Sequence, residues 1–201
     1  MEVFNNTTKI VKDDLVKVIT PGSGISIAAA CFSIYAYQEL KRQLSKIDSL
    51  HFIFTSPTFV TEKSPREKRE FYIPRLNRER SLYGTEFEVK LRNELSQKVI
   101  ARECAEWIRK KVTFKSNATQ EGMGGFLNIE TDDQQLTYMP LNGFTTVDIG
   151  CERGNNIYNM VNKFEAPFSN EYIRLFNSIW NDEARLQDVT EEVIEYISAV
   201  Y

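Results

Sequence analysis

Apolar residues recur at helical spacing near the start of the chain and then give way to a continuous apolar run. Val11, Leu15 and Val18 follow the i, i+4, i+7 pattern of an amphipathic helix within residues 8–19. A Pro-Gly-Ser-Gly stretch ends this helix. The next residues, 25–32, are small and apolar, which is typical of a strand covered on both faces. The pattern therefore predicts a helix followed by a buried strand.

A second helix and a second strand are predicted directly afterwards. Ser33 is a suitable N-cap, and the apolar stripe that follows it comprises Tyr37, Leu40, Leu44 and Ile47. Residues 50–55 are strongly strand-like. A strand, a helix and a strand within about 31 residues make a βαβ unit with a right-handed crossover.

The middle of the chain contains a long charged stretch and then a long helix. Residues 56–83 lack periodicity, and their length favours a functional excursion or an irregular helix over an ordinary loop. Thr85 and Glu88 match a capping box. The apolar repeat Phe87, Leu91, Leu95 and Val99 then predicts a helix of about 25 residues that ends in three basic residues, which suit its C-terminal dipole.

Short strands and two helices are predicted for the last third. The expected strands are 112–115, 125–130, 136–139 and 145–149, with Asn142-Gly143 as a tight turn among them. One closing helix carries Tyr172, Leu175, Phe176 and Ile179, and the other begins at Thr190. These elements predict an α/β fold with a mixed β-sheet flanked by helices.

Composition limits the chemistry. The 201 residues contain one histidine and three widely spaced cysteines, so histidine-rich zinc sites and C-x-x-C motifs are excluded, and no metal or cofactor is expected. Cys31 and Cys104 lie in apolar runs and are expected to pack as small hydrophobic residues. No signal peptide or membrane-spanning run is visible, which favours a cytoplasmic protein without membrane contact.

Charge is distributed unevenly along the chain. Residues 62–115 carry 15 Lys and Arg against 9 Asp and Glu, whereas the whole chain has a net charge of −3. Basic residues with interleaved aromatic residues suit phosphate backbones and stacked bases. Glutamates alternate with them, so a solvated, salt-bridged face is the alternative. The candidate nucleic-acid-binding residues are Lys63, Arg66, Lys68, Arg69, Arg75, Arg78, Arg80, Arg109, Lys110 and Lys111.

Three further groups of residues give little indication of a nucleotide, metal or catalytic site. The glycine-rich stretches 21–24 and 122–125 do not lead from a strand into a helix and are interpreted as turns, so no nucleotide site is expected there. The E-x-K spacing of Glu88 and Lys90 would need Asp132-Asp133 or Asp148 to complete a nuclease-like metal site. The only histidine, His51, lies in a predicted buried strand and is expected to be a hydrogen-bonded core residue.

Four stretches in this order resemble the phospholipase D-like domain at the N-terminus of some bacterial superfamily-two (Swi/Snf-type) helicases. The first is the opening helix followed by Ile25-Ser26-Ile27-Ala28-Ala29-Ala30-Cys31-Phe32-Ser33. The second joins Leu91-Arg92-Asn93-Glu94-Leu95 to Ala101-Arg102-Glu103-Cys104-Ala105-Glu106-Trp107-Ile108. The third joins Gly124-Gly125-Phe126-Leu127-Asn128-Ile129 to Leu141-Asn142-Gly143-Phe144-Thr145. The last joins Leu175-Phe176-Asn177-Ser178-Ile179-Trp180-Asn181-Asp182 to Val189-Thr190-Glu191-Glu192-Val193.

The resemblance implies a catalytic motif that is degenerate in this chain. Active members of that superfamily attack a phosphodiester with the histidine of a His-x-Lys motif. Asn128 stands at the matching histidine position, and Glu130 replaces the lysine. An amide is no covalent nucleophile, and a carboxylate repels the phosphate that the lysine would hold. Asn142 and Thr145 lie near the family's following polar positions and are expected to be remnants of its cleft.

The sequence therefore favours a non-catalytic phospholipase D-like domain that contributes DNA binding or targeting to a putative helicase. Residues 1–182 would form this domain, and 183–201 would be a C-terminal helix linking it to a downstream ATP-dependent helicase core. Two alternatives stay open. One is a phosphodiesterase or nuclease that uses His51 or a metal site, and the other is a protein-interaction domain, with a homodimer as one form of it.

Overall fold

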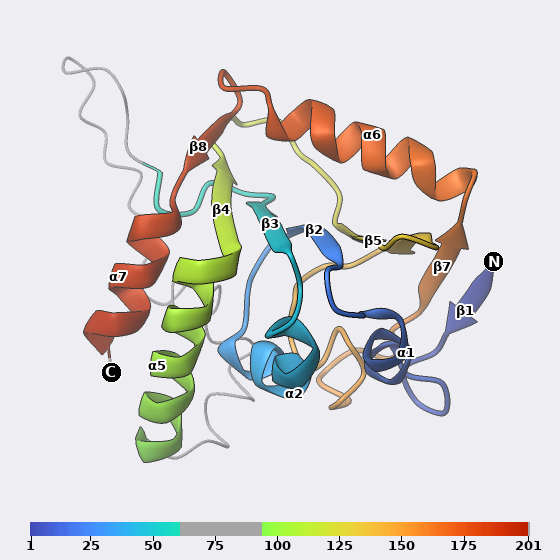
Figure 1. The fold of residues 1–201 in the computed structure, drawn as a ribbon, viewed down its shortest axis with the longest axis horizontal. Coiled ribbons are helices and arrows are strands. Elements are labelled where there is room, and N and C mark those ends of the chain that lie inside the picture. Colours follow the sequence, from blue (N-terminus) through green and yellow to red (C-terminus); the bar gives the residue numbers. More distant parts are fainter. Residues whose placement is uncertain (61–93, 201) are drawn as a thin grey trace.

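One mixed eight-stranded sheet forms the centre of the molecule (Figure 1). The computed structural model describes residues 1–60 and 94–200. The strands are ordered β1-β7-β6-β5-β2-β3-β4-β8 across the sheet. Their bounds are β1 (Glu2–Phe4), β2 (Gly24–Ala29), β3 (Ser49–Phe54), β4 (Val112–Asn117), β5 (Phe126–Glu130), β6 (Gln135–Met139), β7 (Val161–Glu165) and β8 (Leu186–Asp188).

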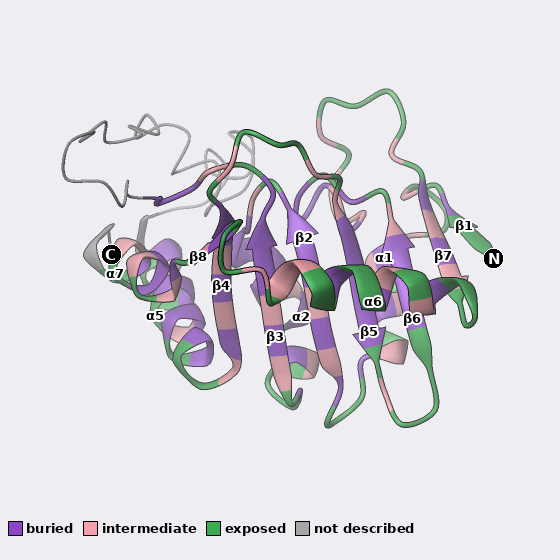
Figure 2. Cartoon of the chain, turned by 90° about the horizontal axis from the view of Figure 1, so that it is seen from above, coloured by how far each residue is buried: buried purple, intermediate pink, exposed green. Residues whose placement is uncertain are grey.

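Helices cover the two faces of the sheet unequally. The five helices of the described residues are α1 (Val11–Val18), α2 (Ile34–Leu44), α5 (Glu94–Lys111), α6 (Phe168–Trp180) and α7 (Thr190–Val200). Figure 2 shows α6 lying across one face, with the other helices behind the sheet. None of the described helices is long and apolar enough to cross a lipid bilayer. The expected α/β class, with a mixed sheet and flanking helices, is thus confirmed.

The strand directions define two edges of the sheet that matter below. β2, β3 and β4 are mutually parallel, and β6 runs the same way because β5 is antiparallel to both β2 and β6. We call the edge where these four strands end the carboxyl edge, and the opposite one the amino edge. Because α2 leads into β3 and α5 leads into β4, both helices end at the amino edge. The parallel pairing of β2 and β3 confirms the predicted βαβ unit.

Side-chain alternation along the strands divides the core. Ile25 and Ile27 of β2 face the layer of α1, α2 and α5, where the phenylalanine rings of β3 and β4 also pack. Ala28, the next residue along β2, faces the other way and packs with Phe126 and Phe176 beneath α6. The larger core therefore lies on the multi-helix side, and α6 covers a smaller one. The alternation explains why a strand of small apolar residues occupies the middle of the sheet.

Several predicted helix boundaries are confirmed. Ser33 caps α2, and its hydroxyl oxygen accepts hydrogen bonds from the amides of Tyr35 and Ala36. α7 begins at Thr190, and the Thr190 hydroxyl oxygen accepts a hydrogen bond from the Phe114 amide, which attaches the helix to β4. α5 ends at Lys111 as expected. The predicted start of that helix, near residue 85, and most of the 56–83 excursion lie outside the described residues.

Two predictions in the last third are wrong. Residues 145–149 form turns and no strand, because the Thr145 side chain accepts a hydrogen bond from the Asp148 amide and the Ile149 amide donates to the Thr145 carbonyl. Asn142-Gly143 is no hairpin turn either. The hairpin that joins β5 to β6 is closed at Thr131 and Gln134 instead.

Three strands are missing from the sequence-based prediction. β1 and β8 have only three residues each, and β7 contains charged residues at alternate positions. Lys163 of β7 is nevertheless buried, and its Nζ lies 3.0 Å from the Asp14 carboxylate. Within the described residues of 183–201, β8 pairs with β4, and Val193 and Ile197 of α7 are fully buried in the main core.

Candidate functional site

Asn128, at the degenerate histidine position, is part of the interior beneath α6. It is 2% exposed, and its amide donates to the Tyr172 carbonyl of α6 over 3.1 Å. Its Oδ1 accepts a hydrogen bond of 2.7 Å from the Thr137 hydroxyl. Glu130 ends the same strand and is exposed. The Asn128 side chain thus joins β5, β6 and α6.

The two expected remnants, Asn142 and Thr145, lie elsewhere. Both belong to the loop that leaves β6 at the carboxyl edge, where the Ala30 amide donates to the Asn142 carbonyl. Asn142 is exposed and Thr145 is buried. Asn128 is in the middle of β5, paired with Ser26 and Thr137, and its side chain turns toward α6. The structure therefore brings Asn142 and Thr145 together but not with Asn128 or Glu130.

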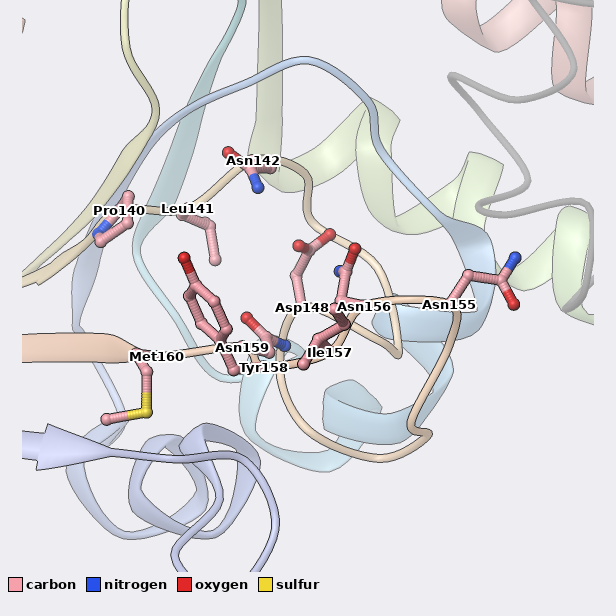
Figure 3. A pocket seen from close by; sticks show the side chains of 10 residues that line it. All are labelled: Pro140, Leu141, Asn142, Asp148, Asn155, Asn156, Ile157, Tyr158, Asn159 and Met160. Carbon is pink, nitrogen blue, oxygen red and sulfur yellow. The ribbon is translucent and has the colours of Figure 1, made fainter.

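A pocket of about 480 Å³ opens beside Asn142 (Figure 3). Two pieces of chain form it, one following β6 and one preceding β7. In Figure 3 the Leu141 and Tyr158 side chains lie on one side of it, and the carboxylate of Asp148 lies near the amide of Asn156. The residues that line it are Pro140, Leu141, Asn142, Asp148, Asn155, Asn156, Ile157, Tyr158, Asn159 and Met160.

Asp148 is the electrostatic centre of this pocket. Its Oδ2 accepts a hydrogen bond of 2.6 Å from the Thr145 hydroxyl, and its carboxylate accepts another from the Gly143 amide. Burial raises the pKa of Asp148 to about 6, and these two hydrogen bonds only partly offset the effect. A carboxylate held in such a position is a feature of functional sites more often than of ordinary surfaces.

Close packing fixes the loop around the carboxylate. A Cβ on Gly143 would lie 2.6 Å from the Cys31 sulfur and 2.9 Å from Asp148 Oδ2. A Cβ on Gly125 would lie 1.8 Å from the Leu141 carbonyl oxygen, which marks where β5 and the loop cross. Only glycine fits at these two positions. Close backbone approaches therefore hold the chain that carries Asn142 and Asp148.

The pocket has no positive charge in its lining. Its residues include one carboxylate, four asparagines and five residues with mainly apolar side chains, but no lysine, arginine or histidine. The side chains of Asn142 and Asn156 hydrogen-bond no other residue in the described part of the chain, whereas Asn159 donates to the Val147 carbonyl. Such a lining suits an uncharged polar ligand with donor groups and repels a phosphate.

His51 lies on the α6 face of the sheet. Its ring stacks on Trp180 with centroids 4.3 Å apart, and Lys115 Nζ lies 4.4 Å from the centroid of the same tryptophan. Burial and the nearby Lys115 lower the pKa of His51. The imidazole is half-buried. It stacks on Trp180, whereas the sequence led us to expect a hydrogen-bonded residue in the core.

A basic surface gathers at the amino edge, on the multi-helix side. Trp107 Nε1 of α5 donates to the Leu44 carbonyl at the end of α2, and Lys111 Nζ donates to the Ile47 carbonyl. These contacts bring the two helix ends together. Residues 41–48 and 98–111 contain eight Lys and Arg against three Asp and Glu. We define the basic surface as the four exposed side chains Arg42, Lys46, Arg109 and Lys110.

Several other sequence candidates gain no support as sites. Lys63 to Arg80, and Glu88 with Lys90, lie outside the described residues. Asp132 and Asp133 are exposed in the β5–β6 hairpin. No group of three or more metal-ligating side chains occurs among residues 1–60 and 94–200. The glycine stretch near Gly22 forms a turn before β2, with the Gly22 amide bonded to the Lys46 carbonyl.

Sequence reasoning missed both assemblies. The pocket joins residues 140–142 and 148 to 155–160, and the last of these were assigned to no element. Six asparagines from position 142 to position 170, four of which line the pocket, were the only available signal. The basic surface adds Arg42 and Lys46 to the predicted Arg109 and Lys110, a pairing that depends on the α2–α5 contact.

Comparison with known proteins leaves the chain without an assigned family. No model of a known protein family matches it, and no curated protein shows a significant sequence match.

Proposed function

We propose that this chain is a non-catalytic DNA-binding domain and that the basic surface holds the phosphate backbone. The observation that carries the proposal is the meeting of the C-terminal ends of α2 and α5, which brings together the two chain segments that carry Arg42 and Lys46 and Arg109 and Lys110. All four side chains are exposed. Lysine and arginine on one face supply the sequence-independent part of DNA affinity by releasing counterions from the phosphates.

The charges of this surface are available for a ligand. None of its four side chains forms an ion pair with another described residue, whereas nearby Lys41 pairs with Glu103 over 2.5 Å. Basic residues at helix C-termini also stabilise the helix dipole, but that role requires only the last turn of each helix. Arg42 and Lys46 belong to the end of α2 and the turn after it, and α5 contacts that helix end through Trp107, so the basic residues extend over two elements. Positive charge spread over two elements suits the binding of a duplex better than it suits the formation of a single salt bridge.

The absence of catalysis in this proposal is supported by the positions of the candidate groups. The amide of Asn128 is occupied by the Tyr172 carbonyl and the Thr137 hydroxyl. His51, the only histidine, is stacked on Trp180 on the other face of the sheet from the basic surface. The pocket beside Asn142 presents a carboxylate and no cation. Within residues 1–60 and 94–200, a phosphodiester would therefore meet no nucleophile together with charge stabilisation in one place.

The finer parts of the proposal come from the sequence resemblance. The mixed sheet with helices on both faces is compatible with a phospholipase D-like domain. In this proposal the domain delivers DNA to a helicase core encoded further along the same protein. The basic surface would then position the duplex, and the helicase core would supply ATP hydrolysis.

A comparison of two double variants tests the DNA-binding surface. Arg109→Ala/Lys110→Ala removes two charges from the basic surface, and Arg174→Ala/Arg185→Ala removes two exposed charges from the α6 side. We expect the first pair to weaken binding of a 20-bp duplex and to reduce the slope of log affinity against log salt by about 2, one for each phosphate contact. The second pair should leave both quantities unchanged. Equal effects of the two pairs, or no saturable binding by the unmodified chain, would refute the proposal.

A turnover assay separates this proposal from the enzyme alternative. The unmodified chain should release no product from a chromogenic phosphodiester, with or without Mg²⁺. Turnover that is lost in His51→Ala or after addition of EDTA would contradict the non-catalytic role.

A further inference from the structure

We propose that the pocket at the carboxyl edge binds a nucleobase that carries an exocyclic amino group, such as adenine or cytosine. This inference is independent of the basic surface, which lies at the opposite edge of the sheet. It starts from the size of the pocket, about 480 Å³, which is within the range of small-molecule sites. It then depends on three properties of the lining: its charge, its hydrogen-bonding groups and its apolar wall.

The charge of the lining excludes anionic ligands. Asp148 is the only ionisable acid or base among the residues that line the pocket, apart from the Tyr158 hydroxyl. The carboxylate accepts a hydrogen bond from the Thr145 hydroxyl at Oδ2 and one from the Gly143 amide, whereas its two oxygens together can accept about four. The carboxylate can therefore accept a further N–H or O–H donor from a ligand. Phosphodiester, sulfate and carboxylate groups offer no such donor at neutral pH.

The amides complete a pattern of donors and acceptors. Asn142 and Asn156 lie on the same pocket as Asp148, and no hydrogen bond ties their side chains to the described part of the chain. An asparagine amide can pair with an amino group and the adjacent ring nitrogen of adenine, and an aspartate accepts from the amino group of cytosine. An amino-bearing base thus matches both kinds of group at once. Uracil and thymine carry a carbonyl oxygen in place of the amino group of cytosine, and the carboxylate repels that oxygen.

The apolar wall suits a flat ring. Tyr158 is 76% exposed and Ile157 is 95% exposed, an unusual arrangement for large apolar side chains in a short loop. Figure 3 shows the Tyr158 ring standing toward Leu141 at the side of the pocket. A base stacked on this ring would cover exposed apolar surface while its edge reaches Asp148. The same ring would have less to gain from a linear polar ligand.

Uncharged nucleosides are the direct probes. We expect adenosine and cytidine to shift the amide resonances of residues 140–160 in a saturable way, and uridine to bind at least about tenfold more weakly, since it forfeits one hydrogen bond to a charged group. Asp148→Asn should abolish the preference for cytidine over uridine, and Asp132→Asn, an exposed matched control, should keep it. Circular dichroism shows whether each variant is folded. Tyr158→Ala removes the stacking surface alone and should weaken the binding of all nucleosides.

Oligonucleotides distinguish two sources of such a base, a free nucleoside and an unpaired base in a strand. If (dC)4 and cytidine bind alike, the ligand is a free nucleoside; if (dC)4 binds more tightly while (dT)4 does not, it is an unpaired base in a strand. Either result supports the pocket assignment. The assignment would be overturned if cytidine and uridine bind equally or if 10 mM nucleoside causes no shift. It would also be overturned if only methyl glycosides, which carry a sugar without a base, cause shifts. The Arg109→Ala/Lys110→Ala variant should still bind (dC)4 at the pocket. This control keeps the test of the pocket separate from the test of the DNA-binding surface.

Discussion

The two edges of the sheet differ in charge and in how they are built. At the amino edge, the ends of two helices carry the exposed side chains Arg42, Lys46, Arg109 and Lys110. At the carboxyl edge, loops enclose a pocket whose only strongly charged group is Asp148. The first edge suits a polyanion and the second an uncharged polar ring. If both proposals hold, the length of the strands separates the phosphate-binding surface from the base-binding pocket.

The two edges also differ in their effect on the stability of the fold. Basic side chains at helix C-termini are favourable for the fold, so the amino edge combines stability with charge. The carboxyl edge instead partly buries the Asp148 carboxylate, which costs free energy, and it depends on glycines where two backbone segments nearly touch. Sites that oppose stability in this way are commonly retained for function.

The largest predicted effect is at the crossing of β5 and the loop after β6. Gly125→Ala places a Cβ 1.8 Å from the Leu141 carbonyl oxygen, so the backbones must separate. We expect the free energy of unfolding to fall by at least about 3 kcal/mol, measured by urea denaturation. Gly124→Ala, whose Cβ meets nothing within 4 Å, is the matched control and should change it by less than about 0.5 kcal/mol. Similar effects of both substitutions would show that the crossing is not tight.

The next effect concerns the polar groups beneath α6. Asn128→Ala leaves the Tyr172 carbonyl and the Thr137 hydroxyl without their partner. We expect a loss of about 2–3 kcal/mol of unfolding free energy. Asn181→Ala removes an amide that donates to Asn177 at the exposed end of α6, and it should cost only a few tenths of a kcal/mol. A small effect of Asn128→Ala would mean that its amide is free for another role.

A smaller, pH-dependent effect is expected from Asp148. Because burial raises its pKa from 3.8 to about 6, the folded chain holds the proton more tightly than the unfolded chain. The cost of ionising it is absent below pH 3.8, grows as pH rises, and is complete above about pH 6. Asp148→Asn should therefore raise the free energy of unfolding by about 1–3 kcal/mol at pH 8 and leave it nearly unchanged at pH 4.

Chemical denaturation at these two pH values measures the difference. Asp132→Asn, on the exposed hairpin, serves as the control and should show no such pH dependence of its effect. A stability gain of equal size at both pH values would contradict the assignment of a buried, ionised carboxylate at the carboxyl edge.

The elements that were predictable carry their signals locally. Ser33 precedes an apolar stripe and caps α2, and Thr190 precedes two glutamates and begins α7. β7 was not predictable because Lys163 looks like a surface residue, although its charge is paired with Asp14 in the interior. Asn142-Gly143 has the composition of a hairpin turn, but contacts with Cys31 and Asp148 determine its conformation. Long-range contacts of this kind leave no trace in a local pattern.

The candidate sites were predictable only in part for the same reason. Arg109, Lys110 and Asn142 could be selected by residue type, but their partners come from distant segments. Arg42 reaches the basic surface through the contact of Trp107 with Leu44. Asp148 was weighed only as a metal ligand, whereas the structure surrounds it with amides.

The measurement that tests the central claim most directly is chemical-shift mapping with a 20-bp DNA duplex. Binding at the basic surface should shift amide resonances in residues 42–48 and 105–112, and the shifts should disappear as salt is raised from 50 to 300 mM, since each phosphate contact adds about one to the salt slope. Resonances of residues 140–160 should not move with a fully paired duplex. Shifts confined to the pocket or to α6, or shifts that persist at high salt, would contradict the account.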